Sequence, residues 1–192
     1  MTAIALGFRV KSGYAIAVAL HGPASAPGAV ARFVVELCDP DAADTRQPYH
    51  HGFYAHEQDA REIGRRVRNV ERCARQSVAA LLDDRRLSGC RHAGLVVGSV
   101  IDPAKVGNPH IRAHACEGRL FRTVLESALR AHNIACEVIV EKQLAARAAA
   151  SLQRRDAEIR EILAGFGKSL VGPWRLDEKA AAAAAWLALA SS

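Results

Sequence analysis

Acidic residues fall at three places where a mixed α/β fold could gather catalytic groups. Asp102 follows a nearly unbroken apolar run, Glu141 follows a shorter one, and Asp177 with Glu178 opens an alanine-rich helical pattern. Such strand ends and helix starts can converge on the crevice beside the carboxyl ends of a sheet. Asp102, Glu141 and Asp177 could there hold Mg²⁺ or Mn²⁺, which would activate water. Taken singly, Asp102 is better interpreted as a turn residue and Asp177 as a helix N-cap.

A second pattern is a stripe of arginines along one predicted helix. Its members, spaced by three or four residues, are Arg61, Arg65, Arg68, Arg72 and Arg75. Such a stripe could follow a nucleic-acid backbone, which attracts several cations along one line. Because Glu62 and Glu71 lie beside it, the default interpretation is the solvated face of an amphipathic helix.

Histidines and aromatic residues gather in the polar connector before that helix. His50, His51 and His56 could bind a metal, but no acid or cysteine completes a recognised ligand spacing. An aromatic-rich loop is the better interpretation. The aromatic side chains, which could stack on bases but more simply cover the sheet, are Tyr49, Phe53 and Tyr54.

Further along, His110 and His114 stand four residues apart, with Glu117 following. This is not the His-Glu-x-x-His pattern of zinc peptidases, and a structural role is favoured. Cys116 lies in the same stretch, but a nucleophilic cysteine needs a base in a defined pocket, which the sequence does not identify. We therefore predict no metal site from these residues.

The composition fits one globular domain spanning residues 1–192, with a formal net charge of +6. A basic balance is compatible with an anionic partner such as nucleic acid but does not require one. The five cysteines include no Cys-x-x-Cys pair, so we expect reduced thiols. No apolar stretch is long enough to cross a bilayer, and we expect a cytoplasmic protein without membrane contact.

The apolar runs follow a definite order. Alternating or continuous runs predict strands at Ala3–Arg9, Tyr14–Leu20, Val30–Cys38, Gly94–Val100 and Cys136–Val140. Helical spacing predicts helices at His56–Leu87 and Ile111–His132, an interrupted one from Glu141 to Leu163, and a last one from Asp177 to Ala190. The predicted fold is therefore a five-stranded mixed sheet in the order β-β-β-α-β-α-β-α, with helices on both faces.

Short motifs within this order resemble the Holliday-junction resolvases and their ribosomal-RNA-processing relatives, which have the ribonuclease H-like fold. Leu6-Gly7-Phe8-Arg9 followed by Tyr14-Ala15 resembles their first strand and turn, in which the strand ends Gly-apolar-Asp. The run Val97–Glu141 resembles their fourth strand through their fifth, including an Asn-Pro element and Glu117-Gly118-Arg119. Asp177-Glu178-Lys179 resembles the acidic start of their last helix.

The resemblance implies two metal ions clamped by acids of the first strand, the fourth strand and the last helix. Here Arg9 stands at the first of these positions and Gly98 or Ser99 at the second, while Asp177 and Glu178 keep the third. An arginine would repel metal cations. We expect Arg9 and Asp177 to form a charge pair in place of the metals.

Three hypotheses follow. The favoured one is a catalytically degenerate resolvase-like domain that binds DNA or RNA, or a protein partner including a second copy of itself, without a cofactor. The first alternative is a divergent nuclease that uses Asp102, Glu141 and Asp177 with Mg²⁺ or Mn²⁺. The second alternative is a structural subunit of a larger assembly, in which the arginine stripe meets an acidic protein.

Overall fold

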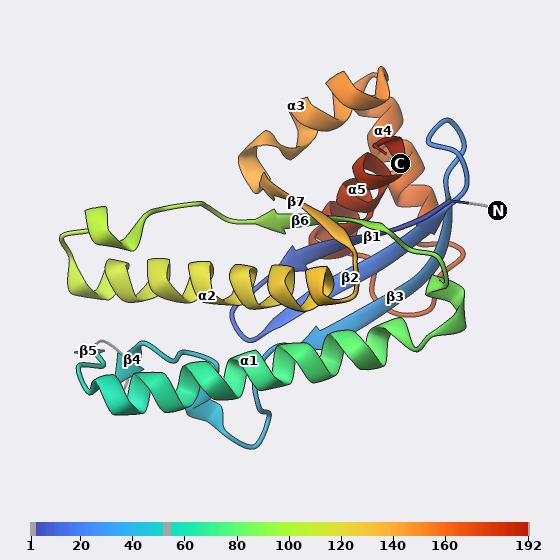
Figure 1. Cartoon of the computed structure of the whole chain (residues 1–192). Helices are drawn as coiled ribbons and strands as arrows, with labels where there is room; N and C mark the ends of the chain where they lie inside the picture. The colour runs from blue at the N-terminus through green and yellow to red at the C-terminus, as the bar shows by residue number, and fades with distance from the viewer. Residues whose placement is uncertain (1–2, 52–54, 192) are drawn as a thin grey trace.

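The computed structural model describes residues 3–51 and 55–191, and its centre is a five-stranded sheet (Figure 1). The strands are β1 (Ile4–Val10), β2 (Tyr14–His21), β3 (Gly28–Glu36), β6 (His92–Val97) and β7 (Ala135–Val140). Their spatial order is β3-β2-β1-β6-β7. The first three strands run antiparallel, whereas β6 lies parallel to both β1 and β7. The predicted mixed sheet is confirmed.

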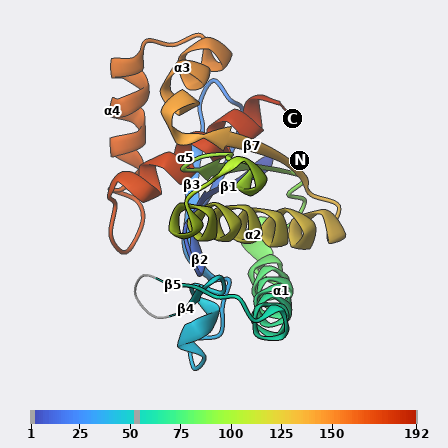
Figure 2. The same cartoon turned by 90° about the vertical axis from the view of Figure 1, so that its left-hand side faces the viewer.

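Helices cover both faces of this sheet, as the sequence predicts (Figures 1 and 2). They are α1 (Ala60–Leu82), α2 (Pro109–Ala131), α3 (Glu141–Leu152), α4 (Asp156–Phe166) and α5 (Leu176–Ala190). On one side, α1 packs on α2, and on the other, α5 lies on β1, β2 and β6 while α3 and α4 pack on α5. None of the described helices has the length and apolar character to cross a membrane.

Short elements account for the differences from the predicted boundaries. The helix predicted from His56 begins only at Ala60, because the Asp59 side chain caps it by accepting from two backbone N–H groups. The connector before it contains a small hairpin, β4 (His50–His51) and β5 (Ala55–His56). The helix predicted to run from Glu141 to Leu163 is two helices, since Gln153 adopts a left-handed φ of 50° and ends α3.

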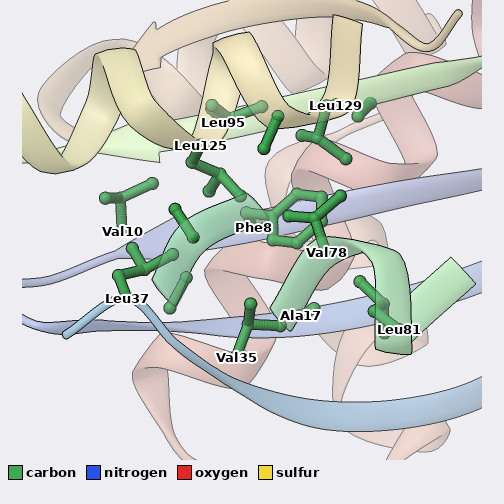
Figure 3. Close-up of a cluster of buried hydrophobic side chains, with 14 of the residues drawn as sticks. Phe8, Val10, Ala17, Val35, Leu37, Val78, Leu81, Leu95, Leu125 and Leu129 are labelled. Carbon is green, nitrogen blue, oxygen red and sulfur yellow. The ribbon is translucent and has the colours of Figure 1, made fainter. Parts of the chain in front are cut away.

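Side-chain alternation along β1 assigns its residues to the two layers. Leu6, Phe8 and Val10 belong to the core beneath α1 and α2. Figure 3 shows the Phe8 ring at the centre of that core, close to Val78 of α1. The residues between them therefore face α5, because successive strand residues point to opposite faces.

The contact between β1 and α5 is unusually close because β1 carries a glycine there. A Cβ at Gly7 would lie 1.9 Å from the Ala181 carbonyl oxygen and 2.3 Å from the Ala185 nitrogen. At Gly94 of β6, a Cβ would lie 2.6 Å from the Ala184 carbonyl oxygen. Two strand glycines and a run of alanines thus let the α5 backbone rest directly on the sheet.

We expect Gly7→Ala to lower the free energy of unfolding by about 3 kcal/mol or more, because a backbone clash cannot be relieved by a rotamer change. Urea denaturation followed by far-UV circular dichroism measures this. Gly165→Ala in α4 is the matched control, since no heavy atom lies within 4 Å of its Cβ position. That control should gain roughly 0.5–1 kcal/mol from helix propensity. Equal stability of Gly7→Ala and wild type would contradict the packing argument.

Candidate functional site

A crevice of about 240 Å³ opens where β1 and β6 end. The end of β1 contributes Arg9 and Lys11, and the segment after β6 contributes Gly98 and Ser99. The facing wall comes from α2, including Phe121. Because the carboxyl ends of parallel strands are the usual ligand-binding edge of an α/β sheet, this crevice is the candidate site.

Arg9 lines this crevice and also contacts two carboxylates, Glu141 and Asp177, that lie outside the crevice lining. Its side chain is only 8% exposed, and its Nη2 donates to Glu141 Oε2 at 2.6 Å. Its Nε lies 3.4 Å from Asp177 Oδ1, and Lys11 Nζ approaches the same oxygen at 3.1 Å. The Val96 carbonyl accepts a long hydrogen bond, 3.5 Å, from Arg9 Nη1.

These contacts place two cations against two carboxylates at the strand ends. The structure puts the predicted pair, Arg9 and Asp177, side by side, and it adds Glu141 and Lys11, which sequence reasoning had not assigned to the pair. A guanidinium is a cation, so a metal ion at this position would face direct repulsion. The arrangement suits charge neutralisation more than metal binding.

The other two acids have structural roles. Asp102 is exposed, and its side chain accepts from the Ala104 N–H to cap the short 3₁₀ helix Pro103–Lys105. Glu178 is buried and accepts from the Arg175 N–H at 2.8 Å and from Arg32 Nη2 at 2.8 Å. Since α5 begins at Leu176 with Arg175 as its N-cap, the prediction that Asp177 is the N-cap was wrong.

These hydrogen bonds lower the pKa of Glu178. Burial raises the pKa of the carboxyl, but the hydrogen bonds from Arg175 and Arg32 favour the charged form more strongly and bring the pKa below its ordinary value of 4.5. Glu178 therefore stabilises the start of α5 as a carboxylate.

All five arginines of the α1 stripe are exposed, but two have acidic partners. Arg65 pairs with Asp44 and Glu62, and Arg72 lies 3.3 Å from Asp39. Within the described residues, the stripe members with no ion pair are Arg61, Arg68 and Arg75. The stripe is therefore only partly neutralised, and three of its charges face solvent.

A second polar cluster joins two groups of histidines that are separate in the sequence. His50 of β4 meets His110 and His114 of α2, with one ring nitrogen of each within 4.8 Å of the others. The buried Glu117 carboxylate lies 2.7 Å from His50 Nδ1 and 3.5 Å from His114 Nδ1. In the part of the chain that the structure describes, this is the one group of three or more potential metal ligands. Asp102, Glu141 and Asp177 therefore do not form a three-acid metal site.

The remaining candidates of this region stay outside both clusters. His51 lies 3.3 Å from Glu57, and Tyr49 packs against the core beneath α1 and α2. Phe53 and Tyr54, proposed for stacking or sheet cover, lie outside the described residues. Burial and the nearby Glu117 raise the pKa of the Cys116 thiol, which makes it a poor nucleophile.

The comparisons with known proteins support the fold. No protein-family model matches the chain, and no curated protein matches it in sequence. Among solved structures, Thermus thermophilus RuvC in complex with a Holliday junction substrate is similar, with a TM-score of 0.53 and 13% identity over 96% of this chain and 91% of that one. A second Thermus thermophilus RuvC structure gives a TM-score of 0.51 and 11% identity, over 96% of this chain and 92% of that one. The chain thus has the ribonuclease H-like fold of RuvC, as its order of apolar runs predicts.

Removing the two acids that pair with Arg9 should cost more stability than removing Arg9 itself. The double variant Glu141→Gln/Asp177→Asn leaves a buried guanidinium without a carboxylate and should lose roughly 3–5 kcal/mol. Arg9→Met leaves carboxylates that are 52% and 34% exposed, so it should lose only about 1–2 kcal/mol. The triple variant should recover much of the loss. Urea unfolding tests this order, and a double variant as stable as wild type would contradict it.

The contribution of Glu178 to the free energy of unfolding should be larger at neutral pH than at acidic pH. Because the folded-state pKa is lowered, the stabilisation is complete above the ordinary pKa of 4.5 and is lost as the pH falls through the folded value. Glu178→Gln should therefore lower the urea midpoint at pH 7, and the gap to wild type should narrow at pH 3. Glu161→Gln, on the exposed side of α4, should change little at either pH. A gap that widens in acid would contradict this sign.

Proposed function

We propose that this domain binds nucleic acid without cutting it, as a catalytically degenerate relative of the resolvases. The observation that carries the proposal is Arg9, a buried arginine at the strand end where the resemblance expects the first metal-clamping acid. Its ion pairs with Glu141 and Asp177 engage two of the three acids that the nuclease alternative would need. Asp102, the third, caps a turn instead.

The charges of the molecule support an anionic partner. The formal net charge is +6, and three exposed arginines of α1 have no ion pair within the described residues. Arg9 and Lys11 are balanced by Glu141 and Asp177, so most phosphate contacts would come from Arg61, Arg68 and Arg75. RuvC, which shares the fold, has been seen with a Holliday junction. A cytoplasmic location and the absence of a Mg²⁺ or Mn²⁺ cofactor are part of this proposal.

We expect the chain to bind four-way-junction or single-stranded DNA in fluorescence anisotropy, with affinity that falls steeply as salt rises. The triple variant Arg61→Ala/Arg68→Ala/Arg75→Ala should bind at least tenfold more weakly, and its slope of log K against log salt should be shallower by roughly 2–3. The variant Arg130→Ala/Arg147→Ala/Arg160→Ala loses the same charge from arginines that pair with acids, and it should bind almost normally.

Two results would overturn the proposal in different directions. If the chain binds no DNA or RNA at low salt, a protein partner, a homodimer or a structural role in an assembly takes its place. If it cleaves DNA with Mg²⁺ or Mn²⁺ and Asp177→Ala abolishes that cleavage, it is a divergent nuclease.

A further inference from the structure

In the histidine cluster, His50 is buried against an acidic side chain of α2. The His50 side chain is 3% exposed, and its Nδ1 lies 2.7 Å from the Glu117 carboxylate, which is 1% exposed. Its other ring nitrogen, Nε2, is buried and has no hydrogen-bond partner among the described residues. A buried polar atom without a partner costs about 1–3 kcal/mol, so this nitrogen calls for a ligand.

The contact with Glu117 determines what that ligand can be. When Nδ1 of His50 carries the proton, it donates a hydrogen bond to the Glu117 carboxylate. Nε2 of His50 then carries a lone pair. Metal-binding histidines have this arrangement, in which a carboxylate behind the ring fixes its tautomer and makes it a stronger ligand. The alternative, a doubly protonated His50 paired with Glu117, would leave a buried N–H group without an acceptor.

The other two rings meet His50 at distances suited to one ion. The Nε2 atoms of His110 and His114 are 3.3 Å apart. Two nitrogens bound at about 2.0–2.1 Å to one tetrahedral zinc ion would be separated by roughly 3.3 Å. The three ring centroids are 4.5–5.2 Å apart, so each imidazole lies next to the other two.

We propose that His50, His110 and His114 bind a zinc ion, with Glu117 as the carboxylate behind two of the rings. Imidazole nitrogens suit zinc and neighbouring transition metals, whereas Mg²⁺ prefers oxygen. Three protein ligands leave a fourth position, and the half-exposed His114 places it toward solvent. The ion would link β4, through His50, to the N-terminal half of α2, through His110 and His114.

Contacts with α1 hold the His50 backbone in place. The backbone carbonyl of His50 accepts from Arg66 Nη1 at 3.0 Å, and Arg66 Nη2 lies 3.2 Å from Glu57. The hairpin backbone is thereby fixed to α1, and two of the ligands come from successive turns of one helix. A site with this preorganisation needs only small side-chain movements to close on an ion.

The test uses the full chain without an affinity tag, stripped of metal with a chelator. Wild type should bind one equivalent of Zn²⁺ in a calorimetric titration. Bound Co²⁺ should give the visible absorption of a metal site with a low coordination number. Thermal unfolding should shift upward with Zn²⁺. His50→Ala and His114→Ala should lose the titration and the shift, and Glu117→Gln should weaken binding about 10–100-fold.

Two controls separate this site from its neighbours. His51→Ala changes an exposed histidine of the same hairpin and should bind Zn²⁺ as wild type does. Asp177→Ala, which removes an ion-pair partner of Arg9, should also leave the titration unchanged. Because His114 is half-exposed, its variant should fold, which circular dichroism verifies. Failure of wild type to bind Zn²⁺, or equal binding by folded His114→Ala, would overturn the proposal.

Discussion

The close approach of α5 to the sheet is the contact on which the rest of the structure depends. The backbone of α5 occupies the space that a side chain at Gly7 or Gly94 would fill, which fixes the helix axis over β1 and β6. The alanine run of α5 is therefore a packing requirement as well as a consequence of helix propensity. Because α5 starts near the end of β1, this contact also fixes where Asp177 lies.

The contact of Gly7 with α5 also determines the orientation of Arg9, two residues further along β1. Gly7 faces α5, so Arg9 must face the same layer and point toward the start of that helix. A guanidinium in this buried position needs carboxylates, because an unpaired charge away from water is costly. Asp177 from the last helix and Glu141, the first residue of α3, supply them. The ion pairs of Arg9 are thus a charge-balanced part of the fold.

Features of the fold that depend on local interactions were predictable from the sequence, and features that depend on distant contacts were not. The element order was predictable because apolar periodicity records which face each element buries, and the resemblance places Arg9 and Asp177 in one crevice. Helix ends were less predictable, since a cap such as Asp59 or a left-handed Gln153 depends on single residues. The histidine cluster was not predictable, because the contact of His50 with α2 exists only after the hairpin packs there.

The chemistry of Arg9 gives a physical reason why binding and cleavage can separate on this scaffold. A metal ion neutralises phosphate charge and also lowers the pKa of a bound water, which supplies the nucleophile. A guanidinium and the Lys11 ammonium can provide the first effect, since they donate hydrogen bonds to anionic oxygens. They cannot provide the second, because they have no vacant orbital to bind water. Because Arg9 and Lys11 are paired with Glu141 and Asp177, the strand ends of this chain balance charge and offer no activated water.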